Sequence, residues 1–302
     1  MKLDPRNIIN SPFGINIAYL LGRFMPYPLG HRIALFVADR IAARKDWKLV
    51  RAVRSNQWVV SGENPDKTAL DKAVAENFRH IASSIFDLYH NLNNPAQSLR
   101  IIDPHPLAVQ LVQRHEFTDR GMILAGIHMS NFDLVFQTGG LAGIKALALT
   151  LPELSKGYNK QWEMRVGKGI DFTPISVGAL KRSVEYLKAG GMVITAVDRP
   201  DPGNIYRPRF FGHPAAVPIH YIFLAVKARV PIRIIAPYKH PDGKYHFLFS
   251  ELIEMQPYQD RHEEIMLNAE NVLHIAEEFI RHDPSQWAMT FPVWPDIMDQ
   301  VP

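Results

Sequence analysis

The sequence contains no cysteine, which excludes disulfides, zinc–thiolate sites and a cysteine nucleophile. It also has no G-x-x-x-x-G-K-[ST] loop, no G-x-G-x-x-G loop and no G-x-S-x-G elbow. Without these phosphate-binding loops, nucleotide and redox chemistry are not expected. The sequence shows no convincing cluster of metal ligands either, so we predict neither a metal site nor a cofactor. The missing elbow argues against an α/β-hydrolase.

Long hydrophobic runs are also missing. The apolar stretch between Pro12 and Pro26 is interrupted by Arg23 and is shorter than the ~20 apolar residues that span a bilayer. No basic segment followed by a small-residue cleavage site is present, so we expect no signal peptide. Any attachment to a membrane is therefore expected to be peripheral.

What the chain does contain is enough apolar sequence for one large folded domain. Of its 302 residues 47% are hydrophobic and 21% are charged, a balance that argues against general disorder.

Positive charge gathers near the N-terminus. Residues 1–54 contain ten Lys and Arg and three acidic residues, a net charge of +7, whereas the whole chain has +4 and the remainder therefore −3. Apolar residues at 13–25 and 33–41 are interleaved with these charges, which predicts amphipathic helices on an anionic surface. Aliphatic residues, not stacking aromatics, accompany the charges, so we expect phospholipid and no nucleic acid.

We accordingly divide the chain into a basic amphipathic helical membrane-associating segment, residues 1–60, and an α/β domain, residues 61–302. The same apolar faces are equally compatible with helices that pack on the body of the domain, because core-facing and lipid-facing stripes have the same spacing. The sequence leaves these two interpretations open.

Helices and strands alternate through the second half of the chain. A long amphipathic helix is predicted around residues 70–88, because apolar residues recur there every three or four positions. Further on, short continuous apolar runs predict buried strands, and the segments between them predict helices. The strands are expected at 122–127, 145–151, 192–197 and 232–236, with an antiparallel edge strand at 244–250, and the helices at 107–115, 132–141, near 159–166, and at 178–189, 218–227 and 261–281. This order predicts an α/β fold with a mixed, largely parallel sheet flanked by helices.

Polar residues follow the first of these strands in an H-x-x-x-x-D pattern, His128 to Asp133. Ser130 or Asn131 is placed to cap the next helix, and both are candidates for contact with a substrate. Asp133, in the first turn of that helix, is expected to reach back to one imidazole nitrogen of His128. The other nitrogen would then accept a proton from an alcohol. Alone, this pattern favours a capping acid and an ordinary turn histidine. Its position after a buried strand, together with the segments that follow, favours the catalytic interpretation.

Two further segments carry candidate residues. Asp198 and Arg199 follow the strand at 192–197, where the guanidinium is suited to bind a phosphate or an oxyanion, although an ordinary Asp–Arg pair would also stabilise such a loop. Phe210 and Phe211 precede a glycine and a proline, and they are candidates for the wall of an apolar tunnel or a cover for the edge of the sheet.

These segments, in this order, resemble the lysophospholipid acyltransferase superfamily. They are most similar to its branch of bacterial lipid A biosynthesis (lauroyl/myristoyl) acyltransferases and phosphatidylinositol mannoside acyltransferases. The resemblance covers about residues 15 to 295. It rests on H-x-x-x-x-D at 128–133, Arg165 with Gly169, LKAGGMVITAVDRPDPG at 187–203, RFFGHPAAVP at 209–218, the I-R-I-I-A-P-Y strand with its K-H-P-D-G-K-Y turn, HDPSQWAM at 282–289 and the upstream segment at 53–78.

The resemblance implies an O-acyltransferase of lipid biosynthesis at the cytoplasmic face of the inner or plasma membrane. It implies that His128 is the general base and Asp133 its orienting acid. The acyl donor would be acyl-CoA or acyl carrier protein, and the acceptor a membrane glycolipid or phospholipid. Arg165 would contact the acceptor headgroup or the donor phosphate, and Asp198 and Arg199 would lie in a loop beside the active site.

The chain departs from the lipid A branch at two positions. Asp133 replaces the usual glutamate, and Arg199 stands where glutamine is common, which suggests a different headgroup. Two other classes of protein stay open: a His/Asp hydrolase, with or without a divalent metal, built on His128, Asp133 and Asp198, and a non-catalytic lipid-binding protein.

Overall fold

Six of the strands form one sheet whose order differs from their order in the chain. The computed structural model describes residues 12–91, 95–103, 105–113, 120–150 and 170–302, and the sheet order is β3-β2-β4-β1-β7-β8. The strands are β1 (Met122–Gly126), β2 (Ala146–Thr150), β3 (Ile170–Pro174), β4 (Met192–Ala196), β7 (Ile232–Lys239) and β8 (Tyr245–Phe249).

The pairing within the sheet is parallel except at one edge. Strand β1 lies between β4 and β7, with Gly126 opposite Ala196 and Ile235, and all three strands run in the same direction. Strand β8 pairs antiparallel with β7. The predicted mixed, largely parallel sheet is therefore confirmed, and the ends of β1, β4 and β7 share one edge.

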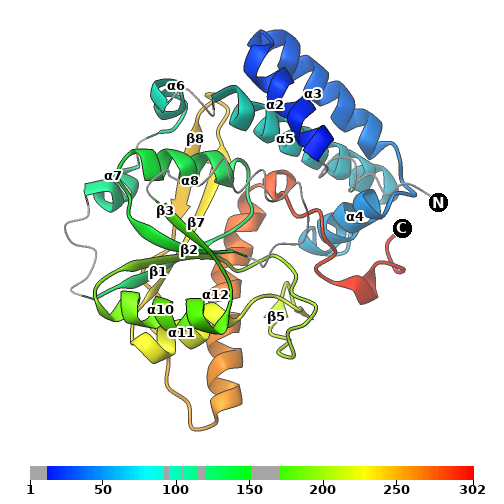
Figure 1. Cartoon of the computed structure of the whole chain (residues 1–302). Coiled ribbons are helices and arrows are strands. Elements are labelled where there is room, and N and C mark those ends of the chain that lie inside the picture. Colours follow the sequence, from blue (N-terminus) through cyan, green and yellow to red (C-terminus); the bar gives the residue numbers. More distant parts are fainter. Residues whose placement is uncertain (1–11, 92–94, 104, 114–119, 151–169) are drawn as a thin grey trace.

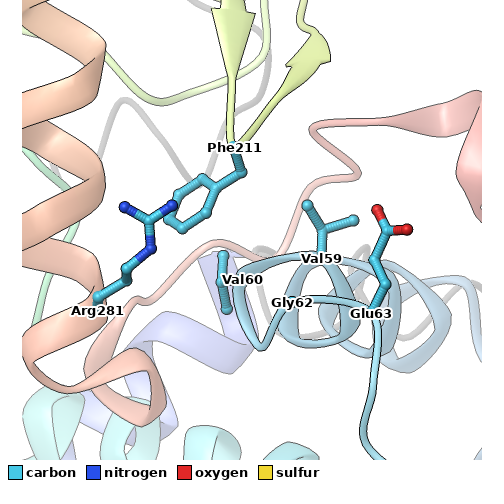
Figure 2. Close-up of a pocket in the computed structure, with 6 residues that line it drawn as sticks. All are labelled: Val59, Val60, Gly62, Glu63, Phe211 and Arg281. Atoms are coloured by element: carbon cyan, nitrogen blue, oxygen red, sulfur yellow. The ribbon is translucent and has the colours of Figure 1, made fainter.

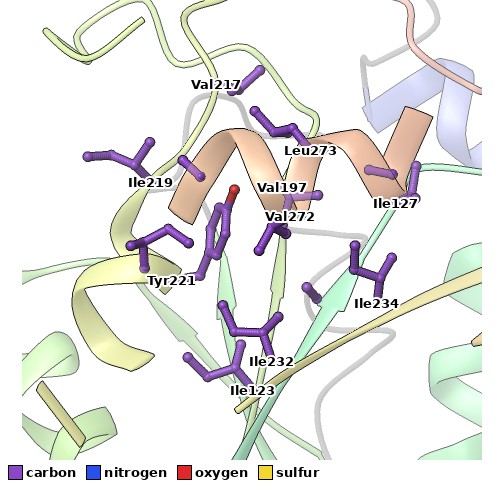
Figure 3. Packing of buried hydrophobic residues seen from close by; sticks show 14 of the residues in the cluster. Ile123, Ile127, Val197, Val217, Ile219, Tyr221, Ile232, Ile234, Val272 and Leu273 are labelled. Carbon is purple, nitrogen blue, oxygen red and sulfur yellow. The ribbon is translucent and has the colours of Figure 1, made fainter. Parts of the chain in front are cut away.

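Helices cover both faces of the sheet (Figure 1). On β1, Ile123 and Ala125 face one apolar cluster and Met122 and Leu124 face another, because successive strand residues point to opposite sides. Figure 3 shows the first cluster, which α10 (Val177–Lys188), α11 (His220–Ala228) and α12 (Arg261–His282) cover. Helix α8 (Phe132–Leu141) covers the opposite face, beside α6 (Pro95–Arg100) and α7 (Pro106–Gln113).

The N-terminal helices form a layer beside the sheet (Figure 1). Helices α2 (Pro12–Phe24) and α3 (Tyr27–Ala42) pack on the long helix α5 (Lys67–Asn91). Apolar side chains stay exposed on α2 and α3, including Leu20, Phe24, Leu29 and Phe36, with Phe24 at 75%. These helices thus pack on the domain with one face and leave another apolar face open. Among the described residues, no helix is long and apolar enough to cross a membrane.

A buried aspartate connects this helical layer to the sheet. Asp87 of α5 accepts hydrogen bonds from the Tyr27 hydroxyl (3.0 Å), the Lys239 ammonium (2.6 Å) and the Tyr245 hydroxyl (2.6 Å). The start of α3 and the end of β7 are therefore held by one carboxylate whose charge Lys239 balances.

Helix α4 (Lys48–Val60) belongs to the packed body although it precedes the predicted boundary at residue 60. Val59 and Val60 lie in the large apolar cluster. The Asn56 amide donates to the carbonyls of Met289 (2.9 Å) and Phe291 (2.8 Å), near the end of the chain. The boundary itself stays a prediction, but the exposed apolar face is confined to the two helices before α4.

Most predicted elements match the structure closely, but helix α6, strand β3 and the β5–β6 pair were not predicted. Helix α8 has the predicted bounds, and α12 extends one residue beyond them. Strand β3 was missed because IDFTP is a half-exposed edge strand without a continuous apolar pattern. The two-residue strands β5 (Arg209–Phe210) and β6 (His213–Pro214) are too short to leave a periodic signal. The helix predicted near 159–166 lies outside the described residues.

Candidate active site

Two neighbouring strands deliver a histidine and an aspartate to the same edge of the sheet. His128 follows β1 and Asp198 follows β4, two residues after the paired Gly126 and Ala196. The backbone N–H of Val197 donates to the Gly126 carbonyl (3.1 Å), so the segments that follow β1 and β4 separate only at His128 and Asp198. Reactive groups in open α/β sheets collect at this edge.

The Asp198 carboxylate binds His128 at two points. Its Oδ1 lies 2.7 Å from the imidazole Nδ1, and its Oδ2 accepts the His128 backbone N–H at 2.9 Å. Oδ2 also accepts the indole N–H of Trp287 at 2.8 Å. An ionised carboxylate accepts only, so Nδ1 carries the proton in the neutral ring and Nε2 is left as the acceptor.

Asp198 is fully buried, yet it stays ionised. Burial alone raises the pKa of this carboxyl, but the charge of His128 and the hydrogen bonds from the His128 ring, Trp287 and the His128 backbone together lower the pKa below its usual value. The site therefore holds a fixed negative charge behind an imidazole whose side chain is 17% exposed.

The turn that carries His128 is held by the segment around η1 (Pro284–Gln286). Ser130 donates its N–H to the Gln286 carbonyl, and the Ala288 N–H donates to the His128 carbonyl, both at 2.7 Å. Ser130 has φ +46°, in the left-handed region, so the turn is sharp and depends on these bonds. The Phe132 ring packs edge-on against the imidazole at 4.7 Å.

The orienting role predicted for Asp133 stays a prediction, because the structure places another carboxylate at Nδ1 of His128. The carboxylate bonded to Nδ1 belongs to Asp198, whose strand lies beside β1, whereas Asp133 is in the first turn of α8 and partly exposed. An acid at that helix position interacts favourably with the helix dipole. A direct catalytic contribution of Asp133 stays a prediction.

Asn131 is the residue that caps α8, as predicted. Its Oδ1 accepts the Leu134 N–H at 3.3 Å, and its amide donates to the Ser84 carbonyl (2.8 Å) and the Tyr245 hydroxyl (3.3 Å). Ser130 and Asn131 are both buried. Contact of either side chain with a substrate stays a prediction.

Of the two predicted cationic residues, Arg199 and Arg165, only Arg199 lies among the described residues. The Arg199 guanidinium stacks over the Phe291 ring, 4.6 Å from its centre, next to Asp198 in the chain. Arg165 lies outside the described residues, so its predicted contact with headgroup or donor phosphate stays a prediction.

Phe210 and Phe211 occupy different environments. Phe210 is fully buried against Trp287 and Trp294. Phe211 and Gly212 both have positive φ, 52° and 78°, and form the two-residue turn between β5 and β6, the geometry of a type I′ hairpin. Of these two rings, Phe211 is the one placed to line a pocket.

That pocket, of about 260 Å³, lies between the end of α4, the β5–β6 hairpin and α12. Figure 2 shows the Arg281 guanidinium beside the Phe211 ring. The guanidinium carbon lies 4.7 Å from the centre of that ring. The Phe211 ring also lies 6.4 Å from Trp287, the residue that donates to Asp198. The predicted tunnel wall stays a prediction.

Sequence reasoning did not identify Trp287 or the bond between His128 and Asp198. Trp287 belongs to the HDPSQWAM segment, but its donor role depends on a contact across 89 positions of sequence. The only available signal was that Asp198, like His128, follows a buried strand.

Together, fold and site define an α/β protein with a histidine–carboxylate pair at the carboxyl edge of a mainly parallel sheet, a pair suited to activating a hydroxyl. The family model of the bacterial lipid A biosynthesis acyltransferases matches residues 5–295. The chain belongs to this family, as its motifs predicted, and is therefore an acyltransferase of lipid biosynthesis by family.

The chain is also similar to a solved structure, the 1-acyl-sn-glycerophosphate (LPA) acyltransferase, PlsC, from Thermotoga maritima. The identity is 15% and the TM-score 0.36, over 83% of this chain and 98% of that chain. Comparison with curated protein sequences gives no significant match.

Proposed function

We propose that this chain transfers a fatty acyl group from a thioester donor, acyl-CoA or acyl carrier protein, to a hydroxyl of a membrane glycolipid or phospholipid. The family supports acyl transfer in lipid biosynthesis. The observation that carries the finer proposal is the His128–Asp198 pair, because it leaves one imidazole nitrogen free to accept a proton.

In the proposed reaction, Nε2 of His128 removes the proton of the acceptor hydroxyl while its oxygen attacks the thioester carbonyl. The imidazolium that forms is stabilised by the buried Asp198 carboxylate, which keeps its own charge. The tetrahedral intermediate then collapses, the C–S bond breaks, and the proton on Nε2 passes to the departing thiolate. The products are an ester and a free thiol, and no acyl-enzyme forms.

The exposed face of α2 and α3 supports a peripheral position at an anionic membrane. The same two helices carry exposed Arg23, Arg32 and Arg40. Arginine side chains at an interface contact phosphates while neighbouring apolar residues enter the headgroup region. We place this face against the cytoplasmic side of the membrane, where thioester donors are made.

An acyl-transfer assay tests the proposal. Purified wild-type protein is incubated with labelled acyl-CoA or acyl carrier protein and a panel of lysophospholipids and glycolipids in detergent. We expect a labelled ester product and a loss of roughly 100-fold or more for His128→Ala. His262→Ala removes an exposed histidine of α12 and is the matched control, expected to keep the wild-type rate.

Three outcomes would contradict the proposal. Undiminished transfer by His128→Ala would exclude this base. Release of free fatty acid without any ester, abolished by a chelator, would favour the metal-dependent hydrolase. Lipid binding without turnover for every donor, unchanged in His128→Ala, would favour a non-catalytic lipid-binding protein.

A further inference from the structure

The turn between β7 and β8 brings two histidines together. Tyr238 pairs with His246 and Lys239 pairs with Tyr245, so His240 begins the turn. The turn is closed by the bonds His240 N–H to Lys244 O and Gly243 N–H to His240 O, both 2.9 Å, with Gly243 at φ +85°. The two imidazole ring centres lie 4.6 Å apart. The fold of the hairpin therefore places both rings at its tip.

A carboxylate from the same turn lies between the two rings. Asp242 Oδ2 is 2.9 Å from His246 Nε2, and Oδ1 is 3.3 Å from His240 Nδ1. The Lys244 backbone N–H donates to Oδ1 at 2.8 Å, which fixes the carboxylate within the turn. One ligand atom from each of the three side chains lies within 4.8 Å of the others. Ligand atoms around a tetrahedral ion are about 3.5 Å apart, so small side-chain rotations bring all three onto one cation.

A second carboxylate supports one of the histidines from behind. Asp103 Oδ2 lies 3.5 Å from Nδ1 of His246, on the side of the ring opposite Asp242. The Asp103 N–H donates to the Tyr245 carbonyl at 2.8 Å, so its position is set by pairing with β8. A carboxylate at the far nitrogen of a histidine fixes the tautomer that presents the other nitrogen to a metal, and such partners accompany most histidine ligands.

We propose that His240, Asp242 and His246 bind a divalent transition-metal ion, with Asp103 as the supporting carboxylate. Two imidazole nitrogens and one carboxylate oxygen suit Zn²⁺, Ni²⁺ or Cu²⁺, and do not suit Ca²⁺ or Mg²⁺, which prefer oxygen ligands alone. The three side chains are partly exposed, so water completes the coordination. The bound ion joins the start and the end of the turn between β7 and β8, and Asp103 contacts the ring of one of its ligands.

The proposal is independent of the acyl-transfer chemistry. The side-chain contacts of the three ligands lie within the hairpin tip and with residues such as Asp103 and Tyr238, and none is made with His128 or Asp198. In the described part of the chain, His240, Asp242 and His246 form a group of histidine and acidic side chains with the spacing of metal ligands.

Calorimetric titration of the full chain, without an affinity tag, with ZnCl₂ in a non-coordinating buffer tests the proposal. We expect one ion bound per chain, and Ca²⁺ and Mg²⁺ at the same concentration should not compete. His240→Ala, Asp242→Asn and His246→Ala should each weaken binding at least tenfold, and Asp103→Asn about 10- to 100-fold. His274→Ala is the control, because His274 is an exposed histidine within 4.0 Å of two glutamates but has no second imidazole.

A second measurement distinguishes loss of metal binding from loss of folding. Co²⁺ added to the wild-type protein should give visible absorption bands that the three ligand variants lose and His274→Ala keeps, while circular dichroism confirms that every variant is folded. Absence of stoichiometric Zn²⁺ binding by the wild-type protein would overturn the proposal. Equal binding by folded His240→Ala and His246→Ala would also overturn it.

Discussion

At the scale of single residues, the site depends on a carboxylate that the sequence places 70 positions away from its histidine. Asp198 accepts from the ring and the backbone of His128 and from Trp287, so its orientation is fixed at both oxygens. Such a carboxylate selects the imidazole tautomer and stabilises the imidazolium.

Asp198→Asn is therefore expected to lower kcat by roughly 100-fold or more and to change KM little, because it presents a neutral amide to Nδ1. The measurement is steady-state acyl transfer, combined with ¹⁵N-histidine NMR, in which the wild-type ring should show the proton on Nδ1. Asp133→Asn is the companion variant. A larger loss of kcat in Asp133→Asn, with the wild-type tautomer kept in Asp198→Asn, would return the orienting role to Asp133.

The candidate residues of the site could be read from the sequence, but their pairing could not. His128 and Asp198 each follow an apolar run, which is a local signal. That β1 and β4 are neighbours depends on the order of strands in the sheet, and this order is set by packing between distant segments. The nearer carboxylate, Asp133, was therefore assigned to the histidine.

At the scale of elements, helix α11 carries a buried tyrosine hydroxyl that has no partner in the described part of the chain. Tyr221 is fully buried in the cluster shown in Figure 3, and its hydroxyl has no hydrogen-bond partner among the described residues. Burial, with the charge of Asp198 as a smaller cause, raises the pKa of this phenol. The hydroxyl is thus neutral and unsatisfied, which costs free energy of folding.

Tyr221→Phe is expected to raise the free energy of unfolding by about 1 kcal/mol, because it removes the unsatisfied group and keeps the ring. Urea denaturation of both proteins measures this difference. A clear loss of stability would contradict the prediction, since it would mean that the hydroxyl has a partner that stabilises the fold.

A second prediction at this scale concerns membrane binding by the exposed face of α2 and α3. The double variant Phe24→Ser, Phe36→Ser removes two exposed aromatic side chains, 75% and 57% accessible, without touching the core. We expect weaker flotation with vesicles that contain anionic phospholipid, and an unchanged melting temperature. Val177→Ser, on α10 and 74% exposed, is the control. Equal flotation of all three proteins would contradict a membrane role for this face.

Elements were predictable where a local pattern was strong. The continuous apolar runs of β1 and β4 and the periodic face of α5 gave their positions directly. Strand β3 and the β5–β6 hairpin depend on pairing partners and turn geometry instead of apolar periodicity, so the sequence pattern did not reveal them.

At the scale of the whole molecule, a partly buried histidine makes stability depend on pH. His220 of α11 is held beside the Thr195 hydroxyl at 2.7 Å, and burial lowers its pKa from 6.5 to about 4. Between these two pH values the unfolded chain therefore binds a proton that the folded protein does not, and stability falls as the pH falls through this range. Below the folded-state pKa, both states bind the proton and the loss of stability from His220 is complete.

Between about pH 7 and about pH 5, His220 is expected to lower the free energy of unfolding by about 2 kcal/mol. His31 and His80, whose pKa values are also lowered mainly by burial, act in the same direction, so the comparison must be made with a variant. We expect His220→Gln to lose less free energy of unfolding than the wild-type protein between these two pH values. Parallel pH dependences in denaturant unfolding would contradict a lowered pKa of His220 in the folded protein.

The central claim is that the imidazole of His128 acts as the base in acyl transfer. Chemical rescue tests it most directly: acyl transfer by His128→Gly is measured with and without added imidazole, at saturating donor and acceptor. We predict a loss of roughly 100-fold or more that free imidazole partly restores. A His128→Gly protein that transfers acyl chains at the wild-type rate without imidazole would contradict the claim.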